Sequence, residues 1–208
     1  MRILFEGGTS TTTTPAILID RDGVINLRRP GDYVLDWSQF VFIPGIRKAL
    51  AALSKLGLPL LVISNQAAVG KGLLTSPGLE TITRRLHESL LMDGASINAF
   101  YYCVHKSDEG CDCRKPRPGM LVRAAADFGI DLARSVFIGD SETDVLAARA
   151  AGCEPVLFGP GISQSGTSMD WTTGVAVAPT PESLYQVTVE SLASLSTPVV
   201  ARRRPLSA

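Results

Sequence analysis

The stretch Ala16-Ile17-Leu18-Ile19-Asp20-Arg21-Asp22-Gly23 decides the fold of this chain. A short apolar run between a Thr/Pro stretch and a glycine predicts a buried central strand of an α/β sheet. Ligands of such sheets bind just beyond the carboxyl ends of the strands. Asp20 and Asp22 repel each other there unless a cation or a shared proton lies between them. The stretch therefore favours a catalytic site, with a loop in which an Asp caps the next turn as the alternative.

Two further apolar runs end in polar residues in the same way. Leu60–Ile63 runs into Ser64-Asn65-Gln66, and Val136–Ile138 runs into a segment that contains Asp140 and Asp144. A lone lysine, Lys115, stands between these two runs in the chain. Because the carboxyl ends of parallel strands share one edge of a sheet, we expect these groups to meet there.

The sequence thus contains four polar motifs in order, namely Asp20 with Asp22, Ser64, Lys115, and Asp140 with Asp144. Their order resembles that of the haloacid dehalogenase superfamily of phosphotransferases, and the resemblance extends over roughly residues 16–158. The resemblance implies an α/β fold: a Rossmann-like three-layer sandwich with a mostly parallel sheet. It also implies a role for each motif. Asp20 would attack phosphorus and form an aspartyl phosphate, and Asp22 would act as general acid and then as general base. Ser64 and Lys115 would hold phosphoryl oxygens; the alternative for Lys115 is a solvated surface lysine.

The resemblance further implies magnesium, because the attack of one anion on another needs a cation, and Mg²⁺ prefers oxygen ligands. Its protein ligands would be the carboxylates of Asp20 and Asp140 and the backbone carbonyl of Asp22. Asp144 would orient Lys115 or a metal-bound water. The alternative for Asp144 is an acid in the first turn of a helix that complements the helix dipole.

A second cluster favours zinc. Cys103, His105, Cys111 and Cys113 fall within eleven residues, and three thiolates with one imidazole make a closed tetrahedral zinc site of the structural type. A disulfide is the alternative, but residues 1–15 lack the sustained apolar core of a signal peptide. We therefore expect a reducing compartment, the cytoplasm. Cys153, outside the cluster, is predicted to be a small buried hydrophobe and His87 a surface residue.

The zinc segment resembles two branches of the superfamily, the D,D-heptose 1,7-bisphosphate 7-phosphatases and the histidinol-phosphate phosphatases. Pro118-Gly119-Met120 and the segment that begins at Tyr33 resemble the heptose branch, whereas the short interval between His105 and Cys111 resembles the histidinol-phosphate branch. The expected substrate is a small phosphorylated sugar. The residues expected to bind it are Asn26, Tyr33, Asn65, Gln66 and Arg114.

Charge gives an independent reason to prefer the heptose bisphosphate. Histidinol phosphate carries an ammonium group, so its pocket needs carboxylates, whereas a second phosphate needs guanidinium or ammonium donors. The loops expected near the site contain both kinds of group, namely Arg28, Arg29, Lys71, Arg114 and Arg117 against Asp32, Asp108, Glu109 and Asp112. Arg114 directly precedes the catalytic lysine, which favours an anionic substrate.

Composition fits one enzyme domain. The chain has 208 residues, with 20 basic and 20 acidic side chains, so no global charge favours nucleic acid or a membrane surface. We expect a monomer with a flexible extension over residues 1–15, one phosphatase domain over residues 16–197 and a disordered tail over residues 198–208. The alternative from another class is a non-catalytic zinc-containing binding module, for which Arg202-Arg203-Arg204 is the best support.

The remaining pattern predicts helices over residues 45–56, 77–92, 119–128, 144–151 and 180–195. It predicts strands over 99–104, 155–158 and 175–177 and a loop over 159–174. About forty residues separate Asp22 from Ser64 and about fifty separate Ser64 from Lys115, which leaves no room for a large cap domain. Substrate selection is therefore expected from loops 26–36, 66–75 and 105–118.

Overall fold

Seven strands form a single sheet in the computed structural model, which describes residues 1–5, 13–29, 32–159 and 170–196. The strands lie in the order β1-β4-β3-β2-β5-β6-β7. Their bounds are Arg2–Leu4 (β1), Ile17–Ile19 (β2), Leu60–Asn65 (β3), Ala99–Cys103 (β4), Val136–Gly139 (β5), Glu154–Phe158 (β6) and Ala176–Ala178 (β7). Only β1 is antiparallel to its neighbour, so the sheet is mostly parallel as the sequence predicts.

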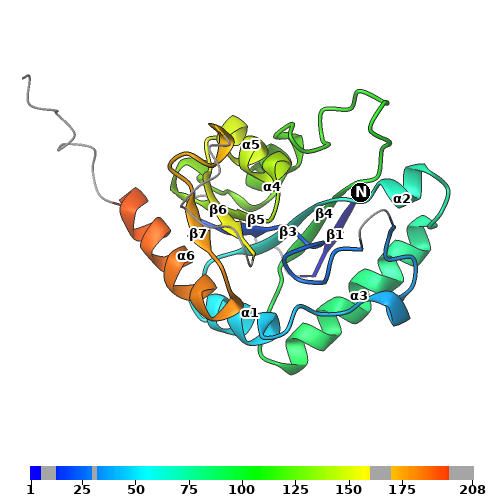
Figure 1. Ribbon diagram of the computed structural model, residues 1–208, viewed down its shortest axis with the longest axis horizontal. Coiled ribbons are helices and arrows are strands. Elements are labelled where there is room, and N and C mark those ends of the chain that lie inside the picture. Colours follow the sequence, from blue (N-terminus) through cyan, green and yellow to red (C-terminus); the bar gives the residue numbers. More distant parts are fainter. Residues whose placement is uncertain (6–12, 30–31, 160–169, 197–208) are drawn as a thin grey trace, which may run out of the picture.

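Helices cover both faces of the sheet and give three layers (Figure 1). One face carries α1 (Ile46–Ser54), α3 (Ser76–Met92) and α6 (Pro181–Ser196), and the other carries α4 (Gly119–Phe128) and α5 (Glu142–Ala151). The short helix α2 (Ala67–Gly70) follows β3, and single 3₁₀ turns cover Trp37–Gln39, Leu132–Arg134 and Asp170–Thr172.

Alternation along the central strand divides the core between these layers. Ile17 and Ile19 pack in the cluster that contains the apolar faces of α1 and α3, and Leu18 packs in the cluster with α4. All three side chains are fully buried, which explains why this strand is a continuous apolar run.

The register of the parallel strands places their polar ends together. Ile19 of β2 lies opposite Val62 of β3 and Ile138 of β5. Strands β2 and β5 therefore end at nearly the same level, just before Asp20 and Asp140, while β3 continues beyond this level to Asn65. Ser64, in the last part of β3, thus lies close to the residues that follow β2 and β5.

Residues 1–15 were predicted to be a loose extension, but the first of them form regular structure. Arg2–Leu4 forms the edge strand β1, in which Ile3 lies opposite Phe100 of β4. Phe5 then stacks on His87, with ring centroids 3.8 Å apart. His87 is buried and not a surface residue, because the N-terminal segment covers it. Residues 6–12 lie outside the described part of the chain, as do residues 198–208.

Most predicted helices and strands are confirmed to within a few residues, and the differences have local causes. Helix α3 begins at Ser76 and not at Pro77, because Thr75 is its N-cap and accepts a hydrogen bond from the Gly78 backbone N–H. Helix α5 begins two residues before the predicted start at 144. Cys153 is buried as predicted. Within the described residues, no helix combines the length and the apolarity that a membrane crossing requires.

We expect Phe5→Ala to lower the free energy of unfolding by about 2 kcal/mol, less than a fully buried phenylalanine because Phe5 is half-buried. Equilibrium urea unfolding measures this change. Leu4→Ala is the matched control, since Leu4 is 47% exposed and its loss should cost less than about 0.5 kcal/mol. Equal effects of the two substitutions would contradict the packing of Phe5 on His87.

Candidate active site

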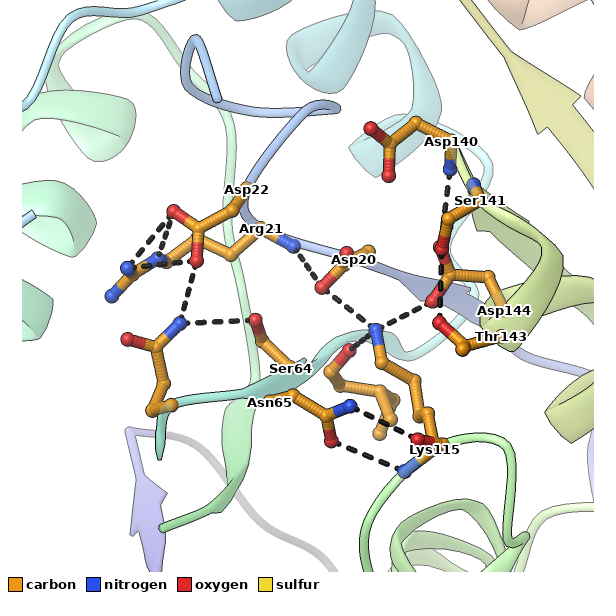
Figure 2. A network of polar contacts seen from close by, with 12 residues as sticks. Asp20, Arg21, Asp22, Ser64, Asn65, Lys115, Asp140, Ser141, Thr143 and Asp144 are labelled. Carbon is orange, nitrogen blue, oxygen red and sulfur yellow. Dashed lines mark hydrogen bonds and ion pairs between the residues drawn. The ribbon is translucent and has the colours of Figure 1, made fainter. Parts of the chain in front are cut away.

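A buried lysine lies at the centre of the strand ends. The Lys115 Nζ is 2.9 Å from Asp20 Oδ1 and 2.6 Å from Asp144 Oδ1, and it donates to the Ile63 carbonyl at 3.0 Å. Figure 2 shows this ammonium group between the two carboxylates. Burial lowers the pKa of Lys115, but Asp144 and Asp20 raise it by more, so the pKa lies above its usual value. Lys115 is therefore a charged, buried group and not a surface lysine.

Asn65 holds the backbone of Lys115 in place. Its amide nitrogen donates to the Lys115 carbonyl at 3.2 Å, and its amide oxygen accepts from the Lys115 N–H at 3.1 Å. The loop that carries Lys115 is thus attached to the end of β3 by a pair of bonds. This contact explains how a residue 50 positions away in the chain reaches the strand ends with a fixed direction.

Asp20 directly follows β2 and is almost fully buried. Its Oδ1 accepts from the Arg21 backbone N–H at 2.7 Å as well as from Lys115. Burial raises the pKa of Asp20 to about 7, against the opposing effect of Lys115 and with further contributions from Asp144 and Asp22. A bound cation would lower this pKa, because it would stabilise the charged carboxylate.

Asp22 sits in a different environment, made of hydrogen-bond donors. Its carboxylate accepts from Nε and Nη2 of Arg21, from Asn26 at 2.9 Å and from Gln66 at 2.7 Å. Burial alone would raise the pKa of Asp22, but Arg21 and these hydrogen bonds lower it below the usual value. The pKa values of the two carboxylates of the first motif are therefore shifted in opposite directions, because their surroundings differ.

Two predicted residues occupy places that the sequence did not indicate. Asn26 is fully buried and donates to Asp22 and to the Leu27 carbonyl, so it holds Asp22 and does not face the open space of the site. Ser64 is also fully buried, and its hydroxyl accepts from Gln66 at 3.1 Å. Gln66 donates to both Ser64 and Asp22. Gln66 lines the cleft, whereas Asn26 and Ser64 do not.

Asp144 makes contacts that fit two of the roles predicted for it, a partner of Lys115 and an acid in the first turn of a helix. Its Oδ2 accepts from the backbone N–H groups of Asp140 and Ser141, which closes the capping box at the start of α5. Its Oδ1 pairs with Lys115. Asp144 is therefore both a helix-cap acid and the partner that orients the lysine.

Three carboxylates at this place fit a divalent cation. Asp20, Asp140 and Asp144 each offer an oxygen within 4.8 Å of the others. Burial raises the pKa of Asp140 to about 6, although Arg28 opposes this effect. The Arg28 Nη2 lies 2.6 Å from Asp140 Oδ1, so a positive group already stands beside these acids. An all-oxygen set of this charge is what Mg²⁺ prefers.

Gly23 allows this arrangement. It has a φ of 97°, a conformation that L residues rarely adopt, and a Cβ built on it would lie 1.9 Å from Asp140 Oδ2. A side chain at position 23 would therefore displace the Asp140 carboxylate. The glycine of the first motif is required by close packing against the third strand end.

An open cleft of about 810 Å³ lies over Asp20 and Lys115. Of the residues expected to bind substrate, Tyr33, Asn65, Gln66 and Arg114 line the cleft and Asn26 does not. The other cations of its wall are Arg28, Arg29, Lys106 and Arg117, together with the buried Arg21. Besides Asp20 and Asp22, the acidic residue among the described lining residues is Asp32. It forms an ion pair with Arg29, at 3.1 Å.

Arg21 and Lys106 are residues of the cleft wall that were not predicted from the sequence. Arg21 is 1% exposed and is the counter-ion of Asp22. Its position between the two aspartates was the only signal in the sequence. Lys106 follows the zinc-ligand candidate His105, whereas Lys71, which the sequence favoured, does not line the cleft.

The cysteine cluster fits zinc geometry. One ligand atom from each of Cys103, His105, Cys111 and Cys113 lies within 4.8 Å of the others. The Cys103 and Cys113 sulfurs are each 3.6 Å from the Cys111 sulfur, close to the ~3.8 Å edge of a tetrahedron with Zn–S bonds of about 2.3 Å. The cysteines are free thiols in the structure, so the disulfide alternative is not favoured. Burial raises the pKa of Cys103 to about 12, so zinc binding there would release a proton.

Comparison with known proteins agrees with this geometry. The family profile described as HAD-hydrolase-like matches residues 112–184. A D-glycero-beta-D-manno-heptose-1,7-bisphosphate 7-phosphatase of Pseudomonas aeruginosa is 41% identical over 145 residues, 70% of this chain and 81% of that protein. The protein of the same name from Escherichia coli K12 is 34% identical over 200 residues, 93% of this chain and 97% of that protein.

A solved structure of a protein with a similar name also resembles this chain. The D,D-heptose 1.7-bisphosphate phosphatase from B. bronchiseptica, crystallised with magnesium and phosphate, superposes with a TM-score of 0.73. Its sequence is 31% identical, and the superposition covers 87% of this chain and 99% of that one.

We expect Cys111→Ser to lower the zinc content of the purified protein from close to one per chain, and to lower its melting temperature. The reason is that the loop carrying Arg114 and Lys115 begins at the zinc ligands. Elemental analysis after exhaustive dialysis and thermal unfolding measure the two effects. Cys153→Ser is the matched control and should keep its zinc. Loss of zinc from Cys111→Ser with no change in stability would contradict the structural role.

Proposed function

The chain belongs to the HAD-like hydrolases, in the family of the D-glycero-beta-D-manno-heptose-1,7-bisphosphate 7-phosphatases, and we propose that it removes the 7-phosphate of this heptose bisphosphate. The chain is a phosphatase of that superfamily. The single observation that carries the substrate is the charge of the cleft wall. Five cations besides Lys115 line it with open access, namely Arg28, Arg29, Lys106, Arg114 and Arg117.

The distribution of acids supports a bisphosphate over histidinol phosphate. An ammonium substrate needs a free carboxylate in the wall, away from the reacting group. Asp32 is the available candidate among the described lining residues, and Arg29 already neutralises it. The histidinol-phosphate alternative remains the second candidate, supported by the short interval between His105 and Cys111.

The first half of the reaction begins at Asp20. In the proposal, Asp20 attacks phosphorus in line with the leaving oxygen and forms an aspartyl phosphate, while Lys115 neutralises the phosphoryl oxygens. Ser64 donates its hydroxyl hydrogen to a phosphoryl oxygen, because its bond with Gln66 uses the hydroxyl oxygen as acceptor and leaves this hydrogen available. Asp22 gives a proton to the leaving oxygen of the sugar.

The second half reverses the role of Asp22. In the proposal, Asp22 takes a proton from the water that attacks the aspartyl phosphate, and phosphate leaves. The lowered pKa keeps Asp22 ionised in the free protein, and the ionised carboxylate is the form that can accept this proton. The approach of the dianionic phosphate raises the pKa of Asp22, because a like charge disfavours the ionised form, and this suits the acid step.

Magnesium and zinc have separate places in the proposal. Asp20, Asp140 and the Asp22 carbonyl would hold Mg²⁺, with Asp144 in the shell behind them; when bound, Mg²⁺ neutralises charge on the transferred phosphoryl group. Zinc would hold the loop of Cys103–Cys113 in shape. Neither role requires the other metal.

Assembly and location are part of the same proposal. In the proposal the enzyme is a monomer that acts as a single domain over residues 16–197. The four free cysteines support the cytoplasm, where thiols stay reduced. A small phosphorylated sugar is the partner, with no nucleic acid and no membrane.

We expect Asp20→Asn to abolish phosphatase activity with an unchanged circular dichroism spectrum, because an amide cannot attack phosphorus. Asp22→Asn should cost on the order of a hundredfold in kcat, as expected for the loss of a general acid and base. Asp36→Asn, a change of the same size at an exposed carboxylate outside the cleft, is the matched control. Substantial activity of a folded Asp20→Asn variant would show that another group is the nucleophile.

We expect Arg114→Ala to lower kcat/KM for the heptose bisphosphate about ten- to a hundredfold more than for a sugar monophosphate. The guanidinium lines the cleft, and its contact with the second phosphate is a charge-assisted bond of about 1.5–3 kcal/mol. The measurement is a substrate panel that also contains histidinol phosphate, with Arg123→Ala as the control outside the cleft. Equal losses on both sugar phosphates would mean that Arg114 positions the Lys115 loop. A wild-type preference for histidinol phosphate would favour the second candidate.

A further inference from the structure

Arg28 makes two contacts that a bound metal would also make. Its Nη2 donates to Asp140 Oδ1 at 2.6 Å and to the Asp22 backbone carbonyl at 3.4 Å. These two oxygens belong to different strand ends, 118 positions apart in the chain. One nitrogen atom that contacts both lies where a cation would bridge them.

These two oxygens are also two of the three protein ligands in the proposed magnesium site. Mg²⁺ binds oxygen at about 2.0–2.1 Å and requires near-octahedral geometry, so it leaves no room for a guanidinium nitrogen that touches the same carboxylate oxygen and the same carbonyl. Arg28 and Mg²⁺ therefore cannot both contact Asp140 Oδ1 and the Asp22 carbonyl at the same time.

Charge explains why an arginine is found there. Asp20, Asp140 and Asp144 place three carboxylates within reach of one ion, and Lys115 pairs with two of them. Asp140 has no contact with Lys115 among the described ion pairs, and its partner there is Arg28. Arg28 thus supplies the positive charge that the third carboxylate lacks.

The position of Arg28 also allows it to leave. Its side chain is 51% exposed, whereas the Lys115 side chain is 2% exposed. It stands in the loop after the first motif and lines the cleft. Solvent can therefore replace its contacts at low cost, which is not true of the buried lysine.

We propose that Arg28 is the resident cation of the magnesium site in the metal-free enzyme, and that Mg²⁺ displaces it from Asp140 and the Asp22 carbonyl. The inference rests on the proposed function for the identity of the metal ligands. It makes Arg28 a positioning residue that competes with the metal. We accordingly expect an affinity for Mg²⁺ that is weaker than the carboxylates alone would give.

The second oxygen of the Asp140 carboxylate gives Arg28 an alternative role, which the experiment has to separate from the first. Arg28 would then stay on Asp140 in the loaded enzyme and hold it in place for the metal. The two roles predict opposite signs for the effect of removing the guanidinium. Metal affinity, measured without any turnover, separates them.

The experiment is isothermal titration of the full chain with Mg²⁺ alone, for the wild type, Arg28→Ala and Arg29→Ala. We expect Arg28→Ala to bind Mg²⁺ about three- to tenfold more tightly, the range for release of a half-exposed charge-assisted contact. Arg29→Ala removes the same charge from the next residue, whose partner is Asp32, and should change the affinity by less than about twofold.

Thermal unfolding gives a second measurement. The shift of the melting temperature on adding Mg²⁺ should be larger for Arg28→Ala than for the wild type, because the tighter ligand stabilises the folded state more. Circular dichroism of Arg28→Ala without metal checks that the variant is folded. Arg28→Lys, which keeps the charge, should bind Mg²⁺ with an affinity between those of the wild type and Arg28→Ala.

Unchanged or weaker Mg²⁺ binding by folded Arg28→Ala would overturn the inference and leave the proposed function standing. If the wild type and Asp140→Asn bound Mg²⁺ equally, the proposed metal ligands would be wrong, and the inference would fall with them. The two failures are thus distinguishable.

Discussion

The ion pairs of the buried Lys115 ammonium hold the rest of the site together. Asp20 at the end of β2 and Asp144 in α5 both point at this group, and the Ile63 carbonyl of β3 accepts its third bond. A buried charge is stable only when it is paired and hydrogen-bonded, and removing one partner of such a pair costs about 3–5 kcal/mol. The fold therefore has to bring three strand ends to one point, and the active site is that point.

Two further features hold the lysine in place. Asn65 holds its backbone through two hydrogen bonds, and the cysteine cluster ends only two residues before it, at Cys113. Zinc bound by this cluster would explain why a loop without regular structure can place a buried side chain. The same loop carries Arg114 and Arg117 into the cleft wall, so the catalytic group and the proposed substrate contacts share one support.

The parts of this arrangement that could be predicted from the sequence are those that depend on local patterns. Apolar runs that end in carboxylates located Asp20, Asp140 and the sheet, because strand ends of a parallel sheet must meet. Strand β1 was missed, since an edge strand of three residues pairs with β4 a hundred positions away and has no local signal. The places of Asn26 and Arg28 were missed for a related reason: polar side chains choose partners that only the tertiary structure brings near.

Formation of a phosphoenzyme at Asp20 is the central claim, and borohydride trapping tests it most directly. The wild-type enzyme is mixed with Mg²⁺ and the heptose bisphosphate, quenched in acid during turnover and treated with borohydride, which reduces an aspartyl phosphate to homoserine. Peptide mass spectrometry then locates the modified residue. We expect homoserine at position 20. Homoserine at position 22 or 140, or none at any aspartate while phosphate is released, would contradict it.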